Sequence, residues 1–176
     1  MTYRETMHLQ PIYNRLYIGG VDAFNPVAAE LFDLPLMHFD AVLRLDQIGI
    51  LSVPTPETTV ALELPIIDGE SVPDGTFPAA THFIHHHLQQ GHSVLSQCHA
   101  GISRSVTMVL AYLVEYQKLS LAQAYHLVSS KHPGAYPHPA LIASLIEHYK
   151  LDIDLRQLKS PKFWDGLIKD DTQQSG

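Results

Sequence analysis

A short run around the only cysteine in the chain constrains the fold more than any other feature. The apolar stretch Ser93–Gln97 before it predicts a buried strand, and the stretch from Ser105 to Tyr116 after it predicts a helix. A strand, a tight loop containing Gly101 and a helix N-terminus together form a site for an anion, because backbone N–H groups and the helix dipole point into the loop. With the thiol of Cys98 at its floor, such a site can carry out chemistry on the anion that it binds.

The residue types in this loop match what a thiol needs in order to cleave a phosphate ester. The attacking group must be a thiolate, which backbone N–H groups and the positive end of a helix favour. Arg104 can hold two phosphate oxygens in a bidentate fork. Ser105 can donate a hydrogen bond to the sulfur when it departs, and Gly101 supplies a backbone geometry that other residues adopt only under strain. The alternative is that Cys98 is a small buried hydrophobe; the flanking strand and helix, the glycine and the two nearby serines favour the phosphate loop.

The run Val94–Ser105 resembles the signature of the cysteine-dependent protein tyrosine phosphatases, and its Ala-Gly-Ile-Ser-Arg-Ser ending is most similar to the dual-specificity branch. Arg15–Gly20 resembles the first-strand motif of that family, and Ala111–Leu113 its helix after the loop. The resemblance implies a protein phosphatase that acts on phosphotyrosine and on phosphoserine or phosphothreonine through a phosphocysteine intermediate, with no cofactor. It assigns the binding of phosphate, or of another oxyanion, to His99, Ala100, Gly101, Ile102, Ser103 and Arg104.

The chain departs from the family pattern at two positions. The family usually has histidine immediately before the nucleophile, where this chain has Gln97. Glutamine can form hydrogen bonds but cannot carry a charge, so the part of thiolate activation that the family histidine supplies does not carry over to this chain. Family members often carry an asparagine that braces the catalytic loop from the connection after the next helix; this chain has His138 at the similar place.

A second group has to protonate the departing ester oxygen and later activate water. The family places an aspartate on a loop after a strand, some way before the cysteine. Here the predicted strand Val60–Ile67 is followed by Asp68, which we expect to be this group. Glu70 and Asp74 are rivals on the same polar loop, and an Asp-Gly pair is also common in ordinary turns.

Strands alternate with helices along the chain, which predicts one α/β domain with a central, mostly parallel sheet of about 4–5 strands flanked by helices. The catalytic domain is expected over residues 1–151, and a packed helical tail over residues 152–176, with a partner-binding segment as the alternative for the tail. The further elements predicted are strands at Leu16–Ile18 and Ala41–Leu45, and helices from Asn25 to Phe32, from Pro78 to Gln90, after the capping box that begins at Ser120, and through Leu141, Leu145 and Tyr149.

Other functions fit the same loop less well. A phosphoinositide, a phosphorylated glycan or an RNA 5′-phosphate could replace the protein substrate, although lipid phosphatases often carry lysines in the loop and this loop has none. Because Gln97 replaces the family histidine, a further alternative is a pseudophosphatase that binds phosphate and has only weak activity. Sulfur transfer of the rhodanese type also uses a cysteine loop, but the spacing to Arg104 and the following Ser105 fit it less well.

Composition limits the partners further. A formal net charge of −7 argues against a general nucleic-acid binder. We find no apolar run long enough to cross a bilayer and no signal-peptide-like start, and a lone reactive thiol suits a reducing compartment, so we expect a cytoplasmic protein and no membrane partner. The cluster His82, His85, His86 and His87 is expected to be a histidine patch on a helix rather than a metal site. The oligomeric state is not predicted.

Overall fold

A four-stranded parallel sheet lies at the centre of the computed structural model, which describes residues 9–24, 37–46, 56–156 and 163–165. Its strands pair in the order β1-β4-β2-β3. All four carboxyl ends therefore meet at one edge of the sheet, where parallel sheets bind ligands. The predicted fold class is confirmed. The strands are β1 (Leu16–Gly19), β2 (Ala41–Arg44), β3 (Val60–Glu63) and β4 (Val94–Gln97).

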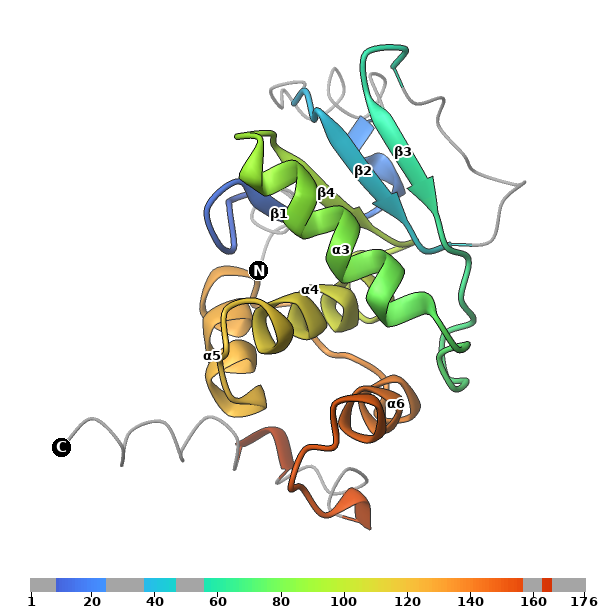
Figure 1. Cartoon of the computed structure of the whole chain (residues 1–176), viewed down its shortest axis with the longest axis vertical. Helices are drawn as coiled ribbons and strands as arrows, with labels where there is room; N and C mark the ends of the chain where they lie inside the picture. The colour runs from blue at the N-terminus through green and yellow to red at the C-terminus, as the bar shows by residue number, and fades with distance from the viewer. Residues whose placement is uncertain (1–8, 25–36, 47–55, 157–162, 166–176) are drawn as a thin grey trace, which may run out of the picture.

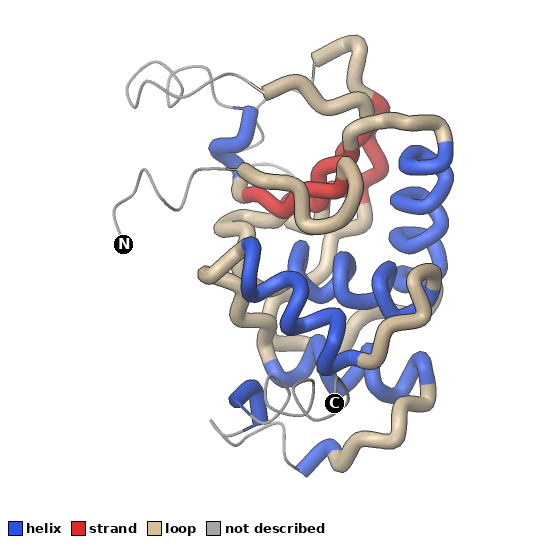
Figure 2. The backbone as a smooth tube through the Cα atoms, turned by 90° about the vertical axis from the view of Figure 1, so that its left-hand side faces the viewer, coloured by secondary structure: helices blue, strands red, loops and turns tan. Residues whose placement is uncertain are grey.

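The helices among the described residues gather beside and below the sheet (Figure 2). A short 3-10 helix, η1 (Val21–Phe24), follows β1. Helices α3 and α4 contact the sheet and each other, and α5 and α6 pack on α4 (Figure 1). The α-helices whose two ends lie within the described residues are α3 (Thr76–Gln89), α4 (Arg104–Glu115), α5 (Leu121–Lys131) and α6 (Pro139–Tyr149).

Helix α4 is buried on every side through most of its length. The spacing of its valines and leucines predicts a single apolar face, yet all of residues 105–113 are buried. The reason is its position, because it contacts β1, β4, α3, α5 and α6. The loop that precedes α4 is therefore fixed to a helix that is packed on all sides.

Two element boundaries near prolines differ from the predictions. Strand β3 ends at Glu63 rather than Ile67, because the N–H groups of Leu64 and Ile66 donate to the consecutive carbonyls of Arg44 and Leu45, which ends the regular alternation of the ladder. Helix α3 begins at Thr76, before Pro78, since the first turn of a helix does not need that N–H. The capping box at Ser120 is confirmed, with Ser120 and Gln123 bonded reciprocally. The helix predicted from Asn25 to Phe32 lies outside the described residues.

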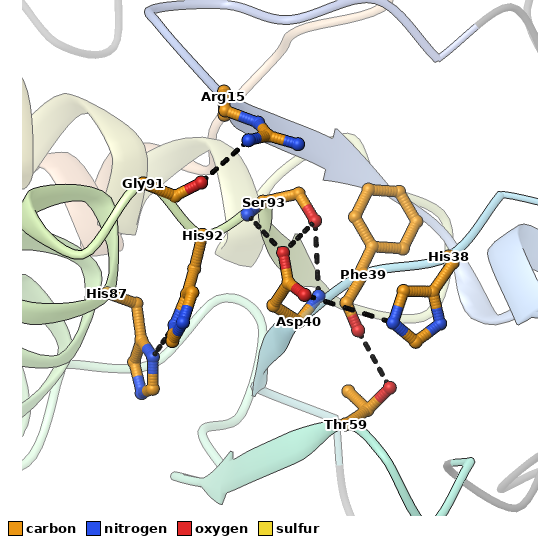
Figure 3. Close-up of polar contacts among 9 residues, drawn as sticks. All are labelled: Arg15, His38, Phe39, Asp40, Thr59, His87, Gly91, His92 and Ser93. Atoms are coloured by element: carbon orange, nitrogen blue, oxygen red, sulfur yellow. Dashed lines mark hydrogen bonds and ion pairs between the residues drawn. The ribbon is translucent and has the colours of Figure 1, made fainter.

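The opposite edge of the sheet, where β2 and β4 begin, carries a polar network (Figure 3). Asp40 accepts hydrogen bonds from the backbone N–H and the hydroxyl of Ser93, both at 2.8 Å. Nearby, the Nδ1 atoms of His87 and His92 lie 3.0 Å apart, so one ring donates a hydrogen bond to the other. These contacts fix the starts of the strands at the end of the sheet remote from Cys98.

The four histidines of the patch on α3 differ in their exposure to solvent. His82 and His86 are exposed and stack on each other, whereas His87 is buried and His85 stacks on Tyr116. Within the described ranges, no three or more His, Cys, Asp or Glu side chains are arranged to hold a metal ion.

Trp164, in the expected tail, packs against α5, with 4.5 Å between its ring centroid and that of Tyr125. Phe163 beside it is also buried. The division between a domain ending at residue 151 and a tail stays a prediction. Over the part of the chain that the structure describes, every helix is too short or too polar to cross a membrane.

Candidate active site

Cys98 lies immediately after β4, at the carboxyl edge of the sheet, and is 2% exposed. Its Sγ atom is 3.1 Å from Oγ of Ser105, which stands in the first turn of α4. Its backbone N–H donates to the carbonyl of Gly19 at 3.3 Å. The sulfur of Cys98 is therefore buried but faces a hydroxyl group. The structure thus brings Cys98 and Ser105 together, as expected from the loop sequence.

Gly101 makes the tight curvature of the loop possible. Its φ of +69° lies in the left-handed region, which glycine adopts without strain. A Cβ atom at this position would also lie 2.8 Å from the carbonyl carbon of Gly19. Glycine at position 101 is therefore required for two reasons, the backbone conformation expected from the sequence and the close approach to the end of β1.

The end of β1 supports the start of the loop. The N–H of Val21 donates to the carbonyl of His99 at 3.0 Å, and the side-chain amide of Gln97 donates to the carbonyl of Gly20 at 3.0 Å. This role of the segment was not predicted from the sequence, although a pair of glycines such as Gly19-Gly20 can indicate a close approach of two backbones.

The connection between α5 and α6 holds the middle of the loop from another direction. His132 donates from Nε2 to the carbonyl of Gly101 at 2.7 Å, and the N–H of Tyr136 donates to the carbonyl of Ile102 at 2.9 Å. Sequence reasoning missed both residues, because nothing in a proline-rich connection indicates which loop it contacts. His99, Ala100 and Ile102 are exposed around the loop.

Arg104 is the first residue of α4 and is half-buried. Its Nη1 atom donates to the carbonyl of Ile66 at 3.3 Å. Ile66 lies two residues before Asp68, so the guanidinium is held between the phosphate-loop candidate and the connection that carries the candidate acid.

Asp68 is joined directly to the loop. The hydroxyl of Ser103 donates to Oδ1 of Asp68 at 2.6 Å, and the same hydroxyl oxygen accepts from the backbone N–H of His138 at 2.9 Å. Asp68 is exposed, and so are its rivals Glu70 and Asp74 on the same connection. The hydrogen bond to Ser103 thus places Asp68, 30 residues before the cysteine in the chain, at the rim of the loop.

Gln97 occupies the position before the cysteine and is 3% exposed. Besides its bond to Gly20, its Oε1 atom accepts from Nε of Arg44 at 3.2 Å. Arg44 in turn lies 3.8 Å from a carboxylate oxygen of Glu63. Sequence reasoning missed Arg44, since it becomes a neighbour only through the pairing of β2 with β4.

The arrangement combines four functional groups at one edge of the sheet. A thiol and a hydroxyl meet at the floor of the loop, a guanidinium stands where the loop enters α4, and a carboxylate is bonded to the loop from outside. The backbone N–H groups at the start of a buried helix favour a bound anion. These groups can bind an oxyanion, attack it and transfer a proton at its edge.

Comparison with known proteins agrees with the family resemblance of the loop sequence. Residues 40–151 match the family model described as the dual specificity phosphatase catalytic domain. Dual specificity protein phosphatase 1B of Arabidopsis thaliana is 36% identical over 145 residues, which are 81% of this chain and 82% of that protein. Dual specificity protein phosphatase 1 of the same plant is 33% identical over 145 residues, 82% of this chain and 70% of that protein.

Among solved structures, the human tyrosine phosphatase-like serine/threonine/tyrosine-interacting protein superposes with a TM-score of 0.69 at 23% identity. The alignment covers 81% of this chain and 96% of that one. At this identity the superposition supports the fold alone, and it agrees with the parallel sheet and helices described above.

Proposed function

Since the chain belongs to the dual specificity phosphatase family and is a cysteine-dependent protein phosphatase, we propose that Cys98, Arg104, Asp68 and Ser105 carry out its reaction in two steps. The substrates are proteins phosphorylated on tyrosine and on serine or threonine. The loop Cys98–Arg104 holds the phosphate through its backbone N–H groups, and Arg104 binds two of its non-bridging oxygens.

In the first step the thiolate of Cys98 attacks phosphorus and the bond from phosphorus to the ester oxygen breaks. Asp68, protonated, gives its proton to that oxygen, so that the side chain of the substrate leaves as a neutral alcohol or phenol. The phosphoryl group stays on sulfur as a phosphocysteine. Arg104 and the loop N–H groups stabilise the charge on the equatorial oxygens during the transfer.

In the second step Asp68, now ionised, accepts a proton from the attacking water. The sulfur–phosphorus bond breaks, and the sulfur leaves as a thiolate. Ser105 donates its hydroxyl proton in a hydrogen bond to that thiolate, which the 3.1 Å contact between the two atoms permits without any movement of the loop. Inorganic phosphate is released, and the enzyme returns to its starting state.

The observation that carries this proposal is the 2.6 Å hydrogen bond from Ser103 to Asp68. This bond supports a role for the Asp68 carboxyl group beside the loop that contains Cys98. It also favours Asp68 over Glu70 and Asp74 as the proton donor, because the bond fixes the Asp68 carboxyl relative to the loop.

The pH dependence of aryl phosphate hydrolysis tests this assignment. Asp68→Asn is expected to lose the basic limb of the kcat profile, because the variant has no carboxyl to deprotonate as the pH rises, and to lower kcat by about 10²- to 10⁴-fold. Asp74→Asn, an exposed aspartate on the same connection, is the matched control and should keep the parental profile. A parental profile in Asp68→Asn with a lost limb in Asp74→Asn would transfer the role to Asp74.

A panel of phosphopeptides tests the substrates. Cleavage of phosphotyrosine together with phosphoserine or phosphothreonine peptides is the expected result, and cleavage of phosphotyrosine alone would contradict dual specificity. Turnover confined to phosphoinositides, glycan phosphates or RNA 5′-phosphates would contradict a protein substrate. Phosphate binding without any turnover would make the chain a pseudophosphatase.

The unpaired thiol of Cys98 also bears on the location. A nucleophilic cysteine persists in its reduced form in a reducing compartment, and cytoplasmic phosphoproteins are therefore the proposed substrates. Fractionation of cells that express the tagged chain would test the location.

A further inference from the structure

We propose that His138 is a positioning residue that holds the acid-bearing turn against the catalytic loop. The inference rests on the proposed function, because it concerns how the carboxyl of Asp68 is kept in place for proton transfer. It derives from the contacts of the His138 imidazole ring, which are separate from the backbone contact of His138 to the loop.

The backbone of His138 is set by its neighbours. It lies between Pro137 and Pro139, and the residue before a proline is restricted to extended conformations. Its φ of −63° and ψ of 138° fit that restriction. In this conformation its N–H donates to Ser103 at 2.9 Å, and Ser103 donates onward to Asp68 at 2.6 Å.

The ring orientation of His138 is fixed as well. His138 is the N-cap of α6, and its Nδ1 atom accepts the backbone N–H of Ala140 at 3.1 Å. An Nδ1 atom that accepts a hydrogen bond carries the lone pair, so a neutral imidazole has its proton on Nε2. The cap thus directs the opposite edge of the ring, with Nε2, away from α6.

That edge of the ring faces the acid-bearing turn. The N–H of Glu70 donates to the carbonyl of Ile67 at 3.3 Å, which closes a turn with Asp68 and Gly69 at its centre. A Cβ atom at Gly69 would lie 3.5 Å from Nε2 of His138, and its three nearest atoms would all belong to that ring. The imidazole ring therefore covers the side of Gly69 on which a side chain would project, next to the acid.

Helix α6 holds the same connection at a second point. The N–H of Val72 donates to the hydroxyl of Ser144 at 3.0 Å, in the middle of α6. In Figure 1 the connection from β3 to α3 descends beside α6. The connection that carries Asp68 is thus held by the loop, through Ser103, and by α6, through His138 at its N-terminus and Ser144 in its middle.

Two substitutions separate the functions of the ring. His138→Ala removes both the cap and the contact with Gly69 but keeps the backbone N–H that binds Ser103. His138→Asn keeps a cap acceptor, since asparagine is among the best N-cap residues, but its shorter side chain does not reach Gly69. His126→Ala, at an exposed histidine on α5, is the matched control.

The readout is the dependence of kcat/KM on the leaving group. An aryl phosphate with a strongly acidic phenol leaves without a proton, whereas an alkyl phosphate needs the general acid. Both His138 variants should lose about tenfold to a hundredfold on the alkyl phosphate, because displacement of a catalytic group by about 1 Å has costs of this order. They should keep the parental value on the activated aryl phosphate and the parental competitive inhibition by inorganic phosphate. Thermal stability should fall in His138→Ala and recover in His138→Asn.

Three results would overturn the positioning role of His138. The His138 variants could lose activity equally on both substrates, they could keep the parental activity on both, or His138→Asn could recover the rate on the alkyl phosphate. Asp68→Asn measured alongside distinguishes the two proposals. If Asp68→Asn shows no selective loss on the alkyl phosphate, the acid assignment itself fails. If it shows that loss and the His138 variants do not, only the inference about His138 fails.

Discussion

Gln97 accepts a hydrogen bond from Arg44, with 3.2 Å between Oε1 and Nε, at the point where β2 and β4 pair. Through its other amide atom it donates to Gly20 at the end of β1. One buried side chain thus connects three strands immediately before the nucleophile. Gln97 lacks the charge that a histidine would bring to this position. Its direct hydrogen-bond partner, however, is the charged guanidinium of Arg44.

Replacement of Gln97 by leucine should destabilise the fold. The substitution keeps the volume but removes the buried hydrogen bonds that Gln97 forms with the Gly20 carbonyl and with Arg44 Nε, which costs about 1–3 kcal/mol in the free energy of unfolding. Urea denaturation measures the loss. Gln89→Leu, at an exposed position near the end of α3, is the control and should change the free energy by less than about 0.5 kcal/mol. Equal stability of the two variants would show that the Gln97 network contributes nothing.

Gly101→Ala should cost more stability than Gly91→Ala. Both glycines have positive φ, +69° and +76°, so each alanine incurs conformational strain of about 1–2 kcal/mol. Only the Cβ atom at Gly101 meets backbone, 2.8 Å from Gly19, whereas at Gly91 no atom lies within 4 Å. Thermal denaturation and phosphate inhibition compare the two variants. Gly91→Ala should keep the parental affinity for phosphate, and an equal effect of both substitutions would contradict the packing argument.

Ser105→Ala should slow the second chemical step more than the first. A hydrogen bond to a charged group contributes about 1.5–3 kcal/mol, so hydrolysis of the phosphocysteine should slow by about tenfold to a hundredfold. Rapid mixing with an activated aryl phosphate should then show a burst of phenol followed by slow turnover. Slow release of phenol without a burst would assign Ser105 to the attack on phosphorus instead.

The stability of the fold should decrease at mildly acidic pH because of His87. Burial, followed by the charges of His92 and His86, lowers the pKa of His87 below its ordinary value of 6.5, while Asp40 opposes the shift. The unfolded chain therefore binds a proton at a higher pH than the folded chain does. The stabilisation is complete above about pH 6.5 and is lost as the pH falls through the lower, folded-state pKa.

Urea denaturation at a series of pH values checks this expectation. The free energy of unfolding of the parent should fall as the pH drops below about 6.5, and His87→Leu should show a smaller fall. His126→Ala, an exposed histidine on α5, should keep the parental dependence. An unchanged pH dependence in His87→Leu would mean that the acid loss of stability comes from other groups.

The strands, the helices and the loop follow from local signals in the sequence. Apolar runs predict β4 and α4, and the spacing of Cys98 and Arg104 defines the loop between them. Ser120 predicts the capping box at the start of α5. Each of these features depends on residues close together in the chain, and for that reason the sequence alone predicts them.

The contacts that complete the site depend on residues far apart in the chain. Asp68 could be proposed from its place after a strand, but its bond to Ser103 spans 35 positions. Arg44 and His132 gave no signal, because each reaches the loop only through strand pairing or helix packing. Sequence spacing does not indicate such neighbours, and the position of the His138 ring beside Gly69 could not be predicted for the same reason.

Direct identification of the covalent intermediate tests the central claim. The Asp68→Asn variant, mixed with an activated aryl phosphate and quenched in acid, should carry one phosphoryl group on the peptide that contains Cys98, because attack proceeds while hydrolysis lacks its base. Cys98→Ser should show neither this modification nor turnover, and should still bind phosphate. A phosphoryl group on any other residue, or parental turnover by Cys98→Ser, would contradict the account.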